Sequence, residues 1–116
     1  IGLPLEEMQQ GLSLQPVTST STIRGTVIHV DRYDNVIVNV EKDLFYKIGN
    51  HRPFELYFKR HDPILQLSKY YHDVPVGEVL CLFNTSDLLE IAINMGKAST
   101  LLGLKVDDAI QIDFHS

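Results

Sequence analysis

The chain of 116 residues has one cysteine, no tryptophan, and fewer basic than acidic residues, 10 against 15. A single cysteine cannot build a disulfide framework, so a reducing, cytoplasmic setting is expected. The formal net charge is −5 and no Lys/Arg cluster occurs, which argues against a nucleic-acid partner because phosphate binding depends on clustered cations. No apolar run approaches the ~20 residues that span a bilayer. We therefore expect neither a nucleic-acid nor a membrane function.

Signatures of metal and nucleophile chemistry are also missing. The five histidines are scattered along the chain, and we expect them at the surface or at strand ends. Zinc sites need several closely placed ligands, and neither a Gly-rich phosphate loop nor a nucleophile elbow occurs. The sequence therefore predicts no metal, no cofactor and no catalytic residue within this chain.

Strand-like sequence, in contrast, is abundant. Hydrophobic residues make up 44% and charged residues 22% of the chain, as in an ordinary globular domain. Short β-branched or alternating runs recur about every ten residues, a pattern typical of all-β barrels and sandwiches. They lie at 23–31, 36–40, 54–59, 64–71, 78–83, 88–94 and 108–114. We favour a small antiparallel β-barrel, since closure removes exposed strand edges.

Helices are expected at only one or two places. The segments 41–50 and 96–103 suit short helices that end at Gly49 and Gly103, because glycine adopts the left-handed conformation at helix ends. Gly25, inside the first predicted strand, suggests a bulge or a close approach of backbone.

The first 22 residues have little regular pattern. Pro4 and Pro16 limit helix and strand, and a TSTST run precedes the first strand. The chain begins with Ile rather than Met, so we expect it to be part of a longer polypeptide. We interpret residues 1–22 as an arm from an upstream domain and residues 23–116 as a C-terminal barrel domain.

The first candidate site is YDNVIVN, from Tyr33 to Asn39. An asparagine amide presents a donor beside an acceptor, which matches the N6 and N7 edge of adenine, so Asn35 could bind a purine. An aromatic side chain two positions earlier could stack on it. The alternative is structural: Asp34 and Asn35 form a turn, and Asn39 ends a strand.

The second candidate is the polar run Asn84 to Asp87, which interrupts apolar sequence in FNTSDLLEIAIN. Asn84 and Asp87 could simply bond backbone groups in an Asx-type turn. Alternatively, Thr85 and Ser86 could contact a small polar ligand at the barrel rim. Spacing alone does not decide between these interpretations.

Taken in order, two stretches resemble a known family. They are GTVIHVDRYDNVIVNV and YYHDVPVGEVLCLFNTSDLLEIAINMGKASTLLGLKVDDAIQIDF. Together with the residues between them they are similar to the C-terminal barrel domain of the S-adenosylmethionine hydroxide adenosyltransferases, over Ile23 to Phe114. The resemblance implies a missing N-terminal α/β domain and a homotrimer, with the substrate between one subunit's N-terminal domain and a neighbour's barrel. It also implies hydrolysis of S-adenosylmethionine to adenosine and methionine, by attack of water or hydroxide on C5′.

The resemblance also assigns roles to residues on the adenine side. Asn35 matches the asparagine that binds the adenine edge. Tyr33 falls where a phenylalanine usually lies beside the purine, and Tyr71 falls where an aromatic side chain stacks on it. Met95 falls where backbone groups bond the adenine.

On the methionine side, Thr85 and Ser86 match the turn that approaches the amino-acid end of the substrate. The residues that position the attacking water belong to the missing domain, so the isolated chain is expected to be inactive.

Departures from the family pattern leave an alternative open. Asp34 and Asp87 replace family glycines, and the arginine that halogenating relatives carry at the position of Ser86 or Ile93 is missing. The missing arginine favours the hydrolytic branch, and it leaves the substrate carboxylate without a charged partner from this domain. The two aspartates leave open a barrel that serves mainly in oligomerisation or as a scaffold. A third possibility, an oligonucleotide-binding barrel, is disfavoured by the acidic balance.

Overall fold

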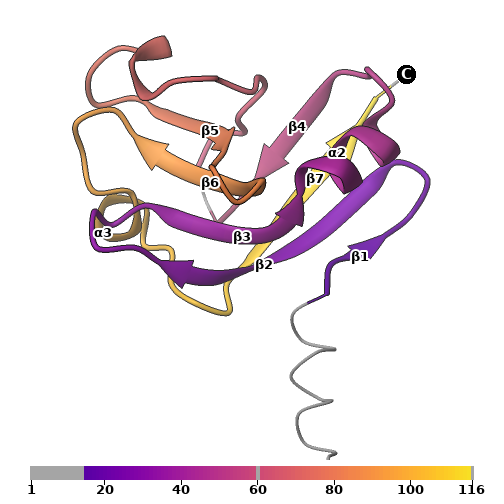
Figure 1. The fold of residues 1–116 in the computed structure, drawn as a ribbon, viewed down its shortest axis with the longest axis horizontal. Helices are drawn as coiled ribbons and strands as arrows, with labels where there is room; N and C mark the ends of the chain where they lie inside the picture. The colour runs from indigo at the N-terminus through magenta and orange to yellow at the C-terminus, as the bar shows by residue number, and fades with distance from the viewer. Residues whose placement is uncertain (1–14, 60, 116) are drawn as a thin grey trace, which may run out of the picture.

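The computed structural model describes residues 15–59 and 61–115. Six strands form a continuous antiparallel sheet in the order β4-β7-β2-β3-β6-β5, and β1 pairs with β2 beside it. The sheet curls into a half-barrel with two short helices (Figure 1), which confirms the all-β expectation. The elements are β1 (Val17–Thr18), β2 (Thr22–Val30), β3 (Val36–Glu41), α2 (Lys42–Gly49), β4 (Phe54–Tyr57), the 3-10 turn η1 (Tyr71–Asp73), β5 (Val79–Phe83), β6 (Leu88–Ile93), α3 (Ala98–Leu102) and β7 (Ala109–Phe114).

The core follows from the alternation of side chains along each strand. On β6, Leu89, Ile91 and Ile93 point inward and are almost wholly removed from water. Each aliphatic side chain buried in this way contributes roughly 1.5–3 kcal/mol. Phe45 of α2 covers one end of the core and packs edge-on against Phe54 and Phe114. The residues that alternate with the inward-pointing ones along these strands point to the outer face of the sheet.

Gly25 marks a close approach between β2 and β3. A Cβ atom added there would lie 2.8 Å from Cγ2 of Val40 and 2.9 Å from Oδ1 of Asn39. The same Oδ1 accepts the N–H of Thr26 at 2.8 Å, next to the shift in register between Val27 and His29. The side chain of Asn39 therefore has a structural role between β2 and β3, although the residue lies inside β3 rather than at the end of a strand, as the sequence suggested.

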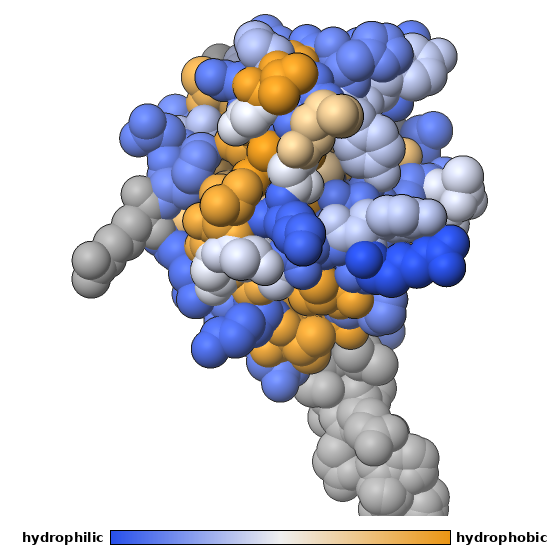
Figure 2. Space-filling model, turned by 90° about the vertical axis from the view of Figure 1, so that its left-hand side faces the viewer, coloured by the Kyte–Doolittle hydropathy of each residue, from blue (hydrophilic) through white to orange (hydrophobic). Residues whose placement is uncertain are grey.

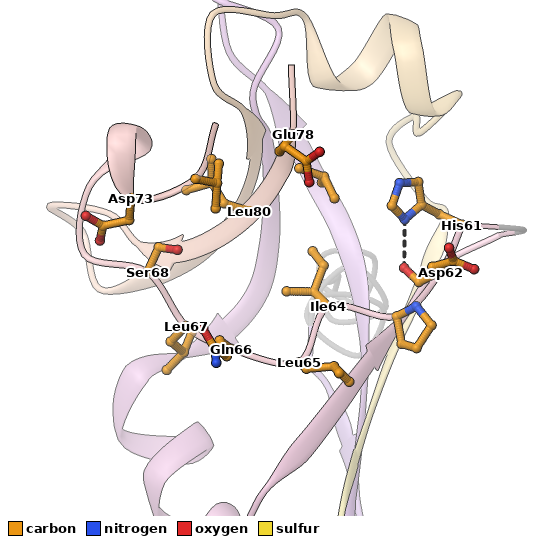
Figure 3. A pocket seen from close by; sticks show the side chains of 13 residues that line it. His61, Asp62, Ile64, Leu65, Gln66, Leu67, Ser68, Asp73, Glu78 and Leu80 are labelled. Atoms are coloured by element: carbon orange, nitrogen blue, oxygen red, sulfur yellow. Dashed lines mark hydrogen bonds between the residues drawn. The ribbon is translucent and has the colours of Figure 1, made fainter. Parts of the chain in front are cut away.

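The strand expected at 64–71 is wrong. Ile64 bridges Leu56 of β4, and Leu67 bridges Cys81 of β5, so the segment spans the gap between the two edge strands without joining a ladder. Leu65, in contrast, is exposed. The apolar residues of this segment alternate as they would in a strand. However, Ile64 and Leu67, three positions apart, pair with two different strands. Figure 3 shows the segment beside a pocket of about 570 Å³.

The end of that predicted strand folds as η1 instead. The carboxylate of Asp73 accepts the N–H groups of Lys69 at 2.8 Å and Tyr70 at 3.0 Å. These local bonds compete with strand pairing, as aspartate side chains commonly do. The outcome places Tyr71 on a loop above the sheet.

The expected arm lies only partly within the described residues. Of its residues 15–22, Val17–Thr18 form β1 against β2, and residues 1–14 lie outside the described part. The domain boundary at residue 22 stays a prediction. In the described ranges, no helix is both long and apolar enough to cross a membrane.

Candidate functional site

The candidate site is formed by the outer face of β5 and β6, by the end of β6 and by the loops beside them. Leu80 and Leu82 of β5 and Ala92 of β6 point away from the core and pack together with Val74, which belongs to the loop that follows η1. This loop covers part of the outer face and leaves a cleft on each side of Tyr71. The side of the molecule that carries α3 and the β2–β3 turn faces the viewer in Figure 2, where apolar patches alternate with strongly hydrophilic ones.

The first cleft has a volume of about 570 Å³. Its walls come from the β2–β3 turn, from η1 and from the loop between β6 and α3. Four of the six residues predicted from the sequence therefore lie around one hollow. The lining residues are Tyr33, Asn35, Tyr71, Ile93, Asn94, Met95, Gly96 and Lys97.

Asn35 is held in place by a tight turn. Oδ1 of Asp31 accepts the N–H groups of Tyr33 and Asn35, both at 2.9 Å. The side-chain amide of Asn35 also donates to Oδ2 of Asp31 at 3.4 Å. The residue is 9% exposed, so its amide is fixed at the cleft wall. Asp31 was not predicted from the sequence as part of the site, although aspartate at the start of a turn is a recognisable signal.

Tyr33 and Met95 border the first cleft with exposed side chains. Tyr33 is 65% and Met95 84% exposed, and neither contributes to the core. The guanidinium of Arg32 lies 5.1 Å from the centre of the Tyr33 ring and donates to its hydroxyl at 3.1 Å. Met95 has a φ of 61°, in the left-handed region that non-glycine residues rarely adopt. This turn directs backbone groups and an apolar side chain toward the same opening.

Tyr71 forms the boundary between the two clefts. Its hydroxyl donates to Oε2 of Glu90 at 2.5 Å, and Glu90 is only 3% exposed. Burial raises the pKa of the Glu90 carboxyl, against the opposing effect of the bond from Tyr71. Burial and the Glu90 carboxylate likewise raise the pKa of the Tyr71 hydroxyl. Glu90 was not predicted from the sequence as part of the site; its signal was a single charged residue in the apolar run LLEIAIN.

The second cleft has a volume of about 480 Å³ and contains Thr85. The complete set of lining residues is Lys69, Tyr70, Tyr71, His72, Leu82, Phe83, Asn84, Thr85 and Glu90. Tyr71 is shared with the first cleft, so a ligand that extends past its ring could contact both hollows. Ser86 is exposed in the same turn but is not among the lining residues.

Asn84 holds the turn that carries Thr85 and Ser86. Its Oδ1 accepts the N–H of Ser86 at 2.9 Å and that of Leu88 at 3.1 Å, which is the expected Asx-type geometry. Asp87 has a φ of 60°, and its carbonyl accepts the N–H of Lys42 at the start of α2, at 2.9 Å. The turn thus keeps left-handed geometry with aspartate in place of glycine, and Thr85 is left beside the cleft.

Metal-binding groups do not gather anywhere in residues 15–59 and 61–115: no set of three or more His, Cys, Asp or Glu residues could hold an ion there. All five histidines are exposed, as expected from their scatter. Amide, hydroxyl and aromatic side chains line the two clefts, together with Lys69, His72, Glu90 and Lys97.

The curled antiparallel half-barrel with two short helices places the chain among small all-β domains. Residues 25–111 match the model of the S-adenosylmethionine (SAM) hydroxide adenosyltransferase C-terminal domain. The match covers most of the sequence, and the chain belongs to this family.

Individual relatives agree with the family match. The chain is 27% identical over 116 aligned positions to the (R)-S-adenosyl-L-methionine hydrolase of Methanocaldococcus jannaschii, covering 88% of this chain and 40% of that protein. A crystal structure of an uncharacterized conserved protein from Thermotoga maritima aligns with a TM-score of 0.72 and 33% identity, over 84% of this chain and 38% of that one.

A conserved hypothetical protein from Thermus thermophilus shares the fold with a TM-score of 0.60 at 22% identity, over 77% of this chain and 34% of that one. The chain thus spans about two fifths or less of the length of each relative.

Proposed function

We propose that this chain is the substrate-binding C-terminal domain of an S-adenosylmethionine hydrolase. It binds the adenine and the amino-acid end of the substrate, and an N-terminal domain of the longer protein supplies the groups that position the attacking water. A homotrimer in which a neighbouring subunit covers the clefts fits this arrangement, because the cleft rim carries exposed apolar side chains such as those of Tyr33 and Met95.

The observation that carries the proposal is the convergence on the first cleft. Asn35, fixed by Asp31, lies at the same opening as Tyr33, Tyr71 and the Met95 turn. An asparagine amide can pair with the N6 and N7 edge of adenine. Stacking of a base on an aromatic ring contributes roughly 1–3 kcal/mol. The set matches a purine better than it matches any small acidic or metal ligand.

The chemistry suits a domain that only binds. Water or hydroxide forms a bond to C5′ while the C5′–sulfur bond breaks; the electron pair stays on sulfur as the neutral thioether of methionine, and a proton leaves the attacking water. Because a sulfonium is already a good leaving group, orientation is the main demand. Alignment of reacting groups can supply roughly 7–11 kcal/mol of barrier reduction. Fixing the adenine and the amino-acid end provides that alignment.

The test is release of adenosine from S-adenosylmethionine by the full-length protein and by its Asn35→Ala variant. We expect the variant to lose substrate affinity, seen as a raised KM, while its oligomeric state in size-exclusion chromatography is unchanged. The 116-residue chain alone should release no adenosine above background. The opposite result, normal KM with disrupted assembly, would support the scaffold function instead.

A further inference from the structure

The outer face of β6 carries one ionisable side chain, Glu90, between aliphatic neighbours. The strand registers place Ile37 of β3 and Leu82 of β5 beside it, and the residue is 3% exposed. Burying a carboxyl in such surroundings costs free energy unless hydrogen bonds compensate. An aliphatic residue would pack there at lower cost, so the position requires an explanation other than packing.

The contacts of Glu90 connect the two clefts. Its Oε2 accepts the hydroxyl of Tyr71 at 2.5 Å, a distance typical of a hydrogen bond to an ionised carboxylate. The side chain of Asn84, which holds the Thr85 turn, lowers the pKa of the same carboxyl. The charge of Asp31, which fixes Asn35, acts on the same carboxyl. Glu90 thus lies between the two turns that border the clefts.

Tyr71 is joined to β6 by this bond. It belongs to η1, outside the sheet, and its ring lines both clefts. The following part of the loop is fastened to β6 by the side-chain amide of Asn94, which donates to the carbonyl of Val74 at 2.8 Å. A tyrosine side chain has only two torsions, so holding its hydroxyl oxygen fixes where the ring lies between the two clefts. The O–H bond prefers the plane of the ring, so the direction of the bond to Glu90 also restrains rotation of the ring about its own axis.

We propose that Glu90 is a positioning residue for ligand binding: through the Tyr71 hydroxyl it holds the ring as the common wall of the two clefts, oriented to stack on a purine. The inference rests on the proposed function, because it takes adenine as the group bound in the first cleft. Phenylalanine at position 71 would keep the stacking surface without its anchor. Glutamine at position 90 would keep the shape and lose the charge-assisted bond.

The test is a double-mutant cycle on adenosine affinity, measured by calorimetry with the full-length protein and its variants Tyr71→Phe, Glu90→Gln and both together. Each single change should weaken binding roughly three- to tenfold, the range expected for one hydrogen bond. The double variant should bind no more weakly than the weaker single variant, because both changes remove the same bond. Tyr57→Phe is the matched control: it removes an exposed tyrosine–carboxylate bond, to Glu55 on β4, and should leave affinity unchanged.

The pH dependence of the same affinities separates positioning from a purely structural role. As the pH falls and the Glu90 carboxylate takes up a proton, the affinity of the wild-type protein for adenosine should decrease. Neither single variant should show this decrease. The other titratable groups that face this carboxyl or line its cleft are Asp31, Lys69, Tyr70, Tyr71 and His72. All of these except Tyr71 are present in all four proteins, so a difference between the proteins comes from positions 71 and 90.

The outcomes distinguish the inference from the function on which it rests. Additive losses in the cycle, or an unchanged pH step in the variants, would overturn the positioning role even if Asn35→Ala abolishes binding. Absence of adenosine binding by the wild-type protein would overturn the proposed function and the inference together. If Glu90→Gln fails to fold, the pH dependence of adenosine affinity in Tyr71→Phe alone tests the positioning role. This variant should fold, because Tyr71 is half-exposed and its ring is retained.

Discussion

The carboxylate of Asp34 accepts the backbone N–H of Thr100 through Oδ2 at 2.7 Å. The carbonyl of Asp34 also accepts the N–H of Ser99 at 2.9 Å. These bonds join the turn that carries Asn35 to the start of α3, so they connect two walls of the first cleft. With a φ of 70°, Asp34 occupies a conformation in which glycine is favoured. The aspartate therefore adds a tether at this position, which offsets its conformational cost.

Replacement of Asp34 should separate these two effects. Asp34→Ala loses the tether and keeps an unfavourable φ, so it should lower the melting temperature most. Asp34→Gly loses the tether but relieves the backbone, and should fall between Asp34→Ala and wild type. Asp34→Asn keeps an acceptor and should be the mildest. Calorimetric melting temperatures check the order, and a glycine variant as stable as wild type would contradict the tether.

The same tether predicts a pH dependence. Hydrogen bonds from Thr100 hold the pKa of the Asp34 carboxyl below its usual value of 3.8. A lowered pKa in the folded state gives stability that is complete above the ordinary pKa and is lost as the pH falls through the folded one. The stability difference between wild type and Asp34→Gly should therefore be constant near neutral pH and shrink below about pH 3.8. An equal difference at all pH values would exclude this contribution.

Cys81 should report whether the segment 64–68 stays on the sheet. The thiol is fully buried, its Sγ lies 3.6 Å from the carbonyl oxygen of Gln66, and burial raises its pKa to about 12. Because thiolate is the reactive form, an aromatic disulfide reagent should label the native protein very slowly. In denaturant one thiol should react at once. Rapid labelling of the native protein would show that the segment opens readily between β4 and β5.

Glu90 should affect stability in the opposite sense to Asp34. Burial raises the pKa of its carboxyl above the usual 4.5 in the folded state, so the folded protein binds this proton more tightly than the unfolded chain does. The unfolding free energy of wild type relative to Glu90→Gln should therefore rise as the pH falls through the raised pKa toward 4.5. Urea unfolding at a series of pH values measures the difference. A difference that falls on acidification would mean that the carboxyl is stabilised mainly as an anion.

Much of the fold could be predicted from alternation. β2, β3, β5, β6 and β7 lie close to where their β-branched runs indicated, because each strand buries at least one face, and β3 and β6 bury both. The strand predicted at 64–71 does not form, because the apolar residues of this segment contact two different strands. No local feature of the sequence reveals these two contacts.

The candidate site was predictable only in part. Turn residues indicated Asn35 and Thr85, whose positions depend on local backbone geometry. Two features could not be predicted from short-range pattern: that Tyr71 lies between two clefts, and that Asp34 tethers α3. Each feature depends on a contact between residues far apart in the sequence. The bond from Tyr71 to Glu90 spans 19 positions, and the bond from Thr100 to Asp34 spans 66.

The most direct measurement is amide chemical-shift mapping of the isotope-labelled 116-residue chain during titration with adenosine. The account predicts saturable shifts that gather at Tyr33 to Asn35, at Tyr71 and at Met95 to Lys97, around the first cleft. No saturable shifts, or shifts confined to the pocket beside Ile64 to Ser68 on the other side of the loop, would contradict a purine-binding role for this domain.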